Sequence, residues 1–167
     1  MSTHNLTESK AQKKIAKMAD NISIAMLLTD LTNLPISTAP MTTKRVDNEG
    51  NIWFLSEKNS EHNDNILKDS RVQLIYSHPS EMEFMSIYGK AEITTDPDSI
   101  EELYSKIDDA WFSGKKDPNI TVLKVSPREA YYWDTKQNKY ISLLKVGAAA
   151  ITGNKADIGK KGKMNIH

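Results

Sequence analysis

The chain has 167 residues, its 22 Lys and Arg are balanced by 22 Asp and Glu, and it contains no cysteine. The charge balance excludes the basic excess of nucleic-acid-binding proteins, and the lack of cysteine excludes disulfides and thiolate metal sites, so we predict no nucleic-acid partner and no metal. No apolar run approaches the length of a membrane span and the N-terminus has no apolar signal core, so we expect a cytoplasmic protein without membrane contact.

The first third of the chain predicts a helix followed by two strands. Thr7 to Ala19 carries apolar residues at helical spacing, and Ser23–Asp30 contains a continuous apolar run of strand length. Ile36 to Val46 is predicted to be a second strand. It contains Pro40, which marks an edge, a bulge or a ligand-facing irregularity because proline cannot donate to a strand ladder.

A hairpin and a short helix are predicted next. Asp47–Gly50 has the composition of a turn, and it leads into a returning strand at Ile52–Ser56. Both faces of that strand are apolar, as expected in a closed or nearly closed barrel. Asn59–Asp69 predicts a short helix with Ile66 and Leu67 facing inward.

Two strands and a further helix fill the middle of the chain. Val72–Tyr76 and Met82–Thr95 are the predicted strands, and Gly89 within the second indicates a bulge or a sharp bend. A helix is predicted to begin after Asp96, where a capping residue precedes a proline. Its apolar stripe runs from Ile100 through Leu103, Tyr104 and Ile107 to Trp111, and Gly114 ends it.

The C-terminal third predicts two strands, Thr121–Ser126 and Ala130–Asp134, on either side of a proline. Tyr140–Val146 is predicted to be a last strand or the start of a helix. Residues 147–167 are rich in Gly, Ala and Lys without periodicity, which predicts a flexible tail. Residues 1–146 are therefore expected to form a single domain with about seven mostly antiparallel strands.

The motifs of side-chain catalysis are absent from the sequence. None of the four histidines stands at the spacing of a helical zinc site, and there is no GxSxG elbow, P-loop or GxGxxG fingerprint. The favoured interpretation is therefore a site in which a bound cofactor carries out the chemistry.

Three short segments, in this order, resemble a known family. They are Ala39-Pro40-Met41-Thr42-Thr43-Lys44, the strand end Leu55-Ser56 with the following Ser60-Glu61-His62, and Tyr131-Tyr132-Trp133-Asp134. Their order and spacing resemble the split barrels of the pyridoxamine 5'-phosphate oxidase-like families, which bind flavin mononucleotide (FMN). The sequence is most similar to the general stress protein 26 group among them.

The resemblance implies a mainly β fold: an antiparallel split β-barrel with flanking helices. It also implies a homodimer with FMN at the interface, where the tryptophan at position 133 reaches the flavin from the partner subunit. The cofactor-binding residues that it implies are Ala39, Met41, Thr42, Thr43, Lys44, Leu55, Ser56, Ser60, His62 and Trp133. No catalytic residue is implied.

The chain departs from the family pattern at two positions that usually carry cations for the flavin phosphate. Ala39 stands where the family has arginine, and His62 stands where it has lysine. A charge-assisted hydrogen bond contributes about 1.5–3 kcal/mol. Loss of both cations therefore weakens the affinity for FMN by about two orders of magnitude or more, unless another cation compensates. An unperturbed histidine is mostly neutral at pH 7 and does not replace the lysine charge.

Two functions follow from these observations. The first is a flavin-dependent oxidoreductase of the general stress type. The alternative is a non-enzymatic binder that holds FMN weakly, holds another flavin, a deazaflavin or haem, or holds no ligand. Each candidate residue also has an ordinary structural role: barrel core for Met41, strand end or helix cap for Ser56 and Ser60, solvated surface for Lys44 and His62, and dimer packing for Trp133.

Overall fold

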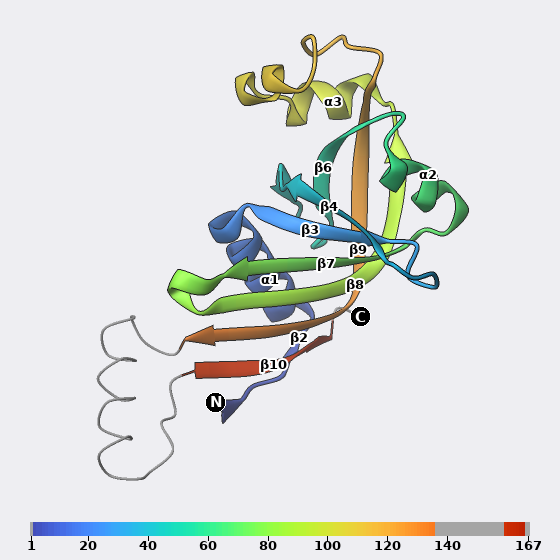
Figure 1. Ribbon diagram of the computed structural model, residues 1–167. Coiled ribbons are helices and arrows are strands. Elements are labelled where there is room, and N and C mark those ends of the chain that lie inside the picture. The colour runs from blue at the N-terminus through green and yellow to red at the C-terminus, as the bar shows by residue number, and fades with distance from the viewer. Residues whose placement is uncertain (1, 136–158, 166–167) are drawn as a thin grey trace.

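The computed structural model describes residues 2–135 and 159–165, which form one mostly antiparallel sheet curled into a half-barrel with helices at its sides (Figure 1). The expected split β-barrel with flanking helices is confirmed. Among the described residues, no helix is long and apolar enough to cross a membrane.

The described residues form α-helices, 3-10 turns and strands, and several strands that are neighbours in the sheet are far apart in the sequence. The helices are α1 (Glu8–Ile22), α2 (Glu61–Lys68) and α3 (Pro97–Leu103), with the 3-10 turns η1 (Pro79–Glu81) and η2 (Lys106–Ala110). The strands are β1 (Ser2–Thr3), β2 (Leu6–Thr7), β3 (Ile24–Thr29), β4 (Ser37–Thr42), β5 (Arg45–Val46), β6 (Ile52–Glu57), β7 (Arg71–His78), β8 (Glu83–Thr94), β9 (Ile120–Thr135) and β10 (Gly159–Asn165). The sheet order is β1-β10-β9-β8-β7-β3-β4. Strand β6 pairs with β5 and with the first part of β9, on the edge of β9 that faces away from β8.

The long strand β9 holds the barrel together. One edge of β9 pairs with β8, while the other pairs first with β6 and then with β10. Tyr88 pairs with Glu129 and Gly89 with Pro127, so Arg128 is an extra residue in a bulge. The bulge that Gly89 predicts is confirmed. It also explains why Pro127 leaves β9 continuous, where the sequence predicts two strands, because a bulge tolerates the missing N–H.

Helix α1 packs across the concave side of the sheet and closes the main core. Ala11, Ile15, Met18 and Ala19 recur at helical spacing, and all four are buried. They belong to the same apolar cluster as Leu74, Tyr76, Met85 and Ile87 on the alternating inner positions of β7 and β8.

Strand β6 is covered on both faces, as its apolar sequence predicts. Ile52 and Phe54 are fully buried in the main core. Trp53 and Leu55 point the other way and pack on a second cluster formed by α3, Tyr104 and the start of β9. Strand β6 is therefore fixed firmly between two cores, and at its C-terminal end the Ser56 hydroxyl contacts His62 and Asn63 of α2.

The barrel is open along one seam, between β4 and β6. Within the described residues β4 pairs with β3 on one side only, and β6 pairs with β5 and β9. One end of the seam is closed by a 2.8 Å hydrogen bond from the Lys44 backbone N–H to the Trp53 carbonyl. The short β5 continues this closure by pairing with β6. We call the open part, between Pro40–Thr42 and Leu55–Glu57, the seam.

The predicted helix between Asp96 and Gly114 is wrong in its second half. Helix α3 begins at the Asp96 cap, as expected, but ends at Leu103 because Tyr104 and Ser105 have extended backbone angles. The chain restarts as η2, which turns the apolar stripe away from the core. Ile107 is 74% exposed and Trp111 is 83% exposed.

The inward position predicted for Leu67 is also wrong. In α2 the neighbouring Ile66 is buried, as expected, whereas Leu67 is 75% exposed. Adjacent residues on a helix point about 100° apart, so a two-turn helix that packs along one narrow stripe buries only one of the two.

The C-terminal segment contains a strand where the sequence predicts a flexible tail. Strand β10 pairs with β9 and, on its other edge, with the N-terminal β1 and β2. Gly162 permits this closeness, because a Cβ at that position would lie 1.9 Å from the His4 carbonyl oxygen. Tyr140–Val146, predicted to be a strand or a helix start, lies outside the described residues.

A Gly89→Ala substitution tests the bulge. A Cβ at position 89 would lie 2.4 Å from the Ser126 carbonyl oxygen. The backbone of β8 at residue 89 or of β9 at Ser126 and Pro127 would have to move to make room for it. We expect a loss of about 1–3 kcal/mol in the free energy of unfolding, measured by urea denaturation. The matched control is Lys90→Ala on the same strand. Lys90 is exposed, so the expected change there is within about 0.5 kcal/mol. Equal effects for the two variants would contradict this account.

Candidate functional site

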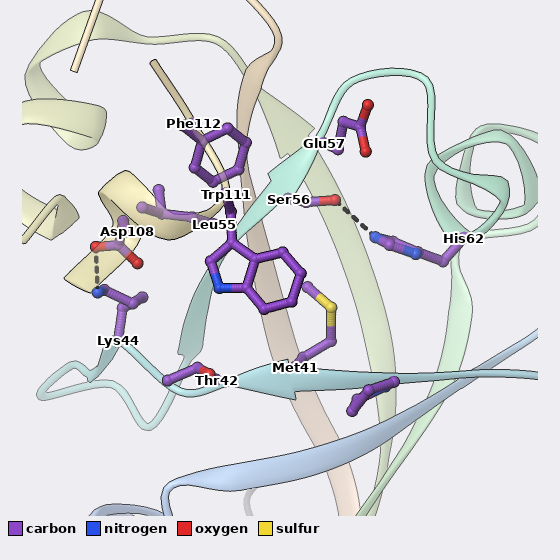
Figure 2. Close-up of a pocket in the computed structure, with 11 residues that line it drawn as sticks. Met41, Thr42, Lys44, Leu55, Ser56, Glu57, His62, Asp108, Trp111 and Phe112 are labelled. Carbon is purple, nitrogen blue, oxygen red and sulfur yellow. Dashed lines mark hydrogen bonds and ion pairs between the residues drawn. The ribbon is translucent and has the colours of Figure 1, made fainter. Parts of the chain in front are cut away.

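A cavity of about 200 Å³ lies in the seam between β4 and β6 (Figure 2). Three elements supply its walls: β4, the end of β6, and the η2 turn with the residues after it, while α2 contributes one side chain. The lining residues are Pro40, Met41, Thr42, Lys44, Leu55, Ser56, Glu57, His62, Asp108, Trp111 and Phe112. We call this cavity the seam pocket.

The middle of the seam pocket is apolar. Met41 and Leu55 face it from the two strands, and Phe112 closes it from above. The Trp111 ring lies over the space between Leu55 and Met41 (Figure 2). This indole is 83% exposed, so it packs on little of the protein itself. A flat, apolar ligand entering the seam would be sandwiched between Trp111 and the strand side chains.

One end of the seam pocket is a cluster of hydroxyls around a histidine. The His62 Nε2 atom lies 2.7 Å from Ser56 Oγ and 3.0 Å from Ser60 Oγ. Ser56 Oγ donates to Asn63 Oδ1 at 2.9 Å, so it accepts from His62, which places the imidazole proton on Nε2. Burial lowers the pKa of His62, and the Glu61 and Glu57 carboxylates offset only part of that shift. The imidazole is therefore neutral at pH 7.

A buried amide holds this end of the seam pocket in place. Asn63 sits in the first turn of α2, and its Nδ2 donates to the Glu57 carbonyl and to Thr121 Oγ1, both at 3.0 Å. Thr121 in turn donates to the Ser56 carbonyl at 3.0 Å. The Ser60 hydroxyl caps α2 by accepting from the Asn63 backbone N–H. These bonds join α2, β6 and β9, so the hydroxyl cluster is preorganised.

The other end of the seam pocket is a buried ion pair. Lys44 Nζ lies 2.6 Å from Asp108 Oδ2, and the two side chains are only 8% and 10% exposed. Lys44 also donates to Ser105 Oγ at 3.0 Å. Burial alone would raise the pKa of Asp108, but the hydrogen bonds from Lys44 and Ser105 outweigh it and lower the pKa below its usual value. The Asp108 carboxylate therefore stays ionised, and the pair offers both a donor and an acceptor to the pocket.

The structure brings most of the predicted site residues to one place. The six that line the seam pocket are Met41, Thr42, Lys44, Leu55, Ser56 and His62. Ser60 does not line it but contacts His62 within hydrogen-bond distance. Thr43 points into the core, where its hydroxyl lies 2.8 Å from the Tyr76 hydroxyl. Ala39 and Trp133 do not line the seam pocket.

Sequence reasoning missed the pocket residues that come from beyond α3. Both Asp108 and Trp111 fall within the segment that the sequence predicts to be one helix, with Trp111 in its apolar stripe. One signal was available: Ser105-Lys106-Ile107-Asp108 has the spacing of a capping box, which indicates a new helical start. The Ser105 backbone N–H donates to the Asp108 carboxylate, as a capping box requires, and the Ser105 hydroxyl also donates to it.

Trp133 lies on an exposed face of the sheet, far from the seam pocket of its own chain. Pro40, Met26, Ile75, Ser86 and Tyr131 are paired in one row across β4, β3, β7, β8 and β9. Strands lie about 4.8 Å apart, so Tyr131 lies about 19 Å from Pro40 when the path is followed along the sheet. Trp133 shares the face of Tyr131 because side chains alternate along a strand.

This face carries an unusual share of exposed apolar side chains. Ile24, Met26, Tyr131 and Trp133 are all exposed on it. A second hollow of about 310 Å³ lies at its β9–β10 end, lined by Tyr131 and Trp133 among others. We call the face with Ile24, Met26, Tyr131 and Trp133 the outer face. It begins at the Pro40 edge of the seam pocket.

A comparison with models of known families matches most of the chain to one of them. Residues 10–157 match the family described as "Pyridoxamine 5'-phosphate oxidase like". The protein bli-3 of Neurospora crassa is 26% identical over 122 residues, which are 66% of this chain, and the match spans 58% of the length of that relative.

Two solved structures are similar in fold. A protein described as a general stress protein 26 from Jannaschia sp. CCS1 matches with a TM-score of 0.76 and 21% identity over 93% of this chain and 98% of that chain. The general stress FMN/FAD binding protein from Xanthomonas citri matches with a TM-score of 0.66 and 27% identity, over 77% of this chain and 92% of that chain.

The residues of the seam pocket fit one part of FMN and not another. Its apolar walls suit a flat ring, and the Lys44–Asp108 pair suits a ring edge that has both hydrogen-bond acceptors and donors. A phosphate needs cations. Among the described residues that line the pocket, Lys44 is the only Lys or Arg, and Asp108 neutralises it. The flavin ring fits these residues, and the phosphate does not.

The neutral state of His62 gives a direct test. We expect its imidazole, followed by NMR and assigned with a His62→Gln variant, to titrate with a midpoint below 6.5 and to carry its proton on Nε2 at pH 7. The unfolded chain binds this proton more readily than the folded one, so the His62 contribution to stability is lost as the pH falls below 6.5. A midpoint above 6.5 would contradict the burial argument.

Proposed function

Because the chain belongs to the pyridoxamine 5'-phosphate oxidase like family, we propose that it is a flavin-binding protein of the general stress type, with the flavin ring in the seam pocket. The observation that carries the proposal is the form of that pocket, which is an apolar slot with a hydroxyl cluster at one end and an ion pair at the other. The FMN/FAD binding relative with 27% identity supports it.

In this proposal the chain binds and orients, and the cofactor reacts. A bound flavin supplies hydride or single-electron transfer. Met41, Leu55 and Trp111 would exclude water from the two faces of the ring. The Lys44 ammonium and the Asp108 carboxylate would donate to and accept from its polar edge. We further propose an oxidoreductase role in the cytoplasm, the setting expected from the sequence.

Trp111 offers a sharp test of where the ring lies. Stacking of a planar base on an aromatic side chain is worth about 1–3 kcal/mol, so Trp111→Ala should weaken flavin binding about tenfold or more. The change leaves the fold intact because the indole is 83% exposed. The measurement is quenching of flavin fluorescence as protein is added to riboflavin and to FMN.

The matched control is Ile107→Ala in the same turn. Ile107 is 74% exposed but does not line the seam pocket, so its removal should leave affinity unchanged. Equal affinity of the wild type and both variants would place the ring elsewhere. No binding of either flavin at high micromolar concentration would refute the proposed function. Reduction of the bound flavin by a reduced nicotinamide would separate an oxidoreductase from a non-enzymatic binder.

We also propose that the functional unit is a homodimer formed through the outer face. Ile24, Met26, Tyr131 and Trp133 expose apolar surface of the kind that a subunit interface covers. The outer face is continuous with the Pro40 edge of the seam pocket. A two-fold pairing would therefore set this face of one protomer beside the pocket of the other. Trp133 is too far from its own pocket, so it would contact the ligand only in this arrangement.

A charge at the centre of the outer face should separate the subunits. Met26 is 40% exposed between β4 and β7, and Met26→Lys would bury an unpaired ammonium in the proposed interface. Sedimentation should show a dimer for the wild type and a monomer for this variant. Leu67→Lys, equally apolar-to-basic but on α2, should remain a dimer. A monomeric wild type would refute the homodimer while leaving the pocket proposal intact.

A further inference from the structure

The seam pocket has an excess of negative charge. The described residues that line it include three side chains with a full charge at pH 7, namely Lys44, Glu57 and Asp108. Lys44 and Asp108 cancel one another at 2.6 Å. Glu57 remains, so the lining has one net negative charge. This carboxylate stands at the end of β6, next to the hydroxyl cluster.

The hydroxyl cluster brings no positive charge of its own. Ser56 and Ser60 are neutral, and burial lowers the pKa of His62. The His62 Nε2–H is directed at the two serine hydroxyls and not free for an anion. The charged groups that act on His62 are the Glu61 and Glu57 carboxylates, so the charges beside this end of the pocket are negative.

The cations that neighbour the lining residues in the chain do not supply the missing charge. Arg45 follows Lys44 but pairs with Glu102, and its guanidinium lies 4.9 Å from the Trp53 ring centre. Lys58 follows Glu57, and neither Arg45 nor Lys58 lines the seam pocket. A dianionic phosphate would therefore face the Glu57 carboxylate at one end of the slot and the neutralised Lys44–Asp108 pair at the other.

We infer that the seam pocket selects a flavin whose side chain ends without charge, the riboflavin class, over flavins that carry phosphate. The inference rests on the proposed function and narrows its ligand. The ribityl chain of riboflavin is a polyol, and its hydroxyls can donate to the Glu57 carboxylate and to the Ser56 hydroxyl oxygen, both of which line the seam pocket. FMN has the same ring and polyol but adds a phosphate. On binding, the phosphate would lose hydrating water without gaining a hydrogen bond from a cation, which costs binding free energy.

Competing titrations of the full chain test this selection. Riboflavin, FMN and lumiflavin, which has the ring without the ribityl chain, are each titrated with protein at low salt. We expect riboflavin to bind at least about tenfold more tightly than FMN, which corresponds to about 1.4 kcal/mol. Lumiflavin should bind more weakly than riboflavin because it lacks the polyol. FMN binding equal to or tighter than riboflavin would overturn the inference.

The Glu57→Gln variant assigns the selection to charge. Removing the carboxylate should raise FMN affinity severalfold and change riboflavin affinity little. The difference in affinity between riboflavin and FMN, called the gap below, should therefore narrow. High salt should narrow the gap in the wild type as well, because salt screens charge repulsion. Glu92→Gln makes the same charge change at an exposed position outside the seam pocket and should leave the gap unchanged.

The two levels of the proposal fail in different ways. If no flavin binds, the proposed function fails. If flavins bind but the FMN gap does not respond to Glu57→Gln or to salt, the ring site stands and the inference about charge is overturned. If Glu92→Gln narrows the gap as much as Glu57→Gln does, the selection comes from the charge of the whole protein and not from the pocket, which also overturns it.

Discussion

The absence of strand pairing between β4 and β6 is the constraint from which the site follows. A fully closed barrel would fill this space with a ladder of hydrogen bonds. Here β4 contains Pro40, which has no N–H to give, and a single backbone bond from Lys44 to Trp53 closes one end of the seam. The edges of both strands are thereby left to line a pocket. The positions of β4 and β6 are still well determined, because β4 pairs with β3 and β6 pairs with β9 along the edges that face away from the seam.

The side chains at the two ends of the seam make this opening selective. Asp108 neutralises Lys44, which is the one Lys or Arg among the described residues that line the pocket. The Asn63 hydrogen bonds hold Ser56 and His62 together as a neutral cluster. Buried polar groups of this kind are costly unless they are satisfied, and here each has partners within the protein. The result is a slot that is rich in hydrogen-bonding groups but has no unpaired positive charge among its described lining residues.

Much of this arrangement follows from local patterns in the sequence. The apolar runs that become β3, β6 and β7, the Asp96 cap and the Gly89 bulge are properties of neighbouring residues, and they are in the structure where they are expected. Asp108 and Trp111 reach the seam only because the backbone breaks at Tyr104 and starts again at Ser105. That break depends on competition between a helical stripe and a local cap, which composition and periodicity do not decide. The distance of Trp133 from the pocket depends on strand order, which no single segment encodes.

The pairing of β10 with the N-terminal strands has a consequence for biosynthesis. Asn5 and Lys163 are bonded across 158 positions of sequence, so this edge of the sheet forms only after position 163 has left the ribosome. Until then the β10-facing edge of β9 offers unpaired backbone groups beside exposed aromatic rings. Such an edge is a template for pairing with other nascent chains. Pairing of β10, which carries lysines at positions 160, 161 and 163, covers that edge of β9 and removes the template.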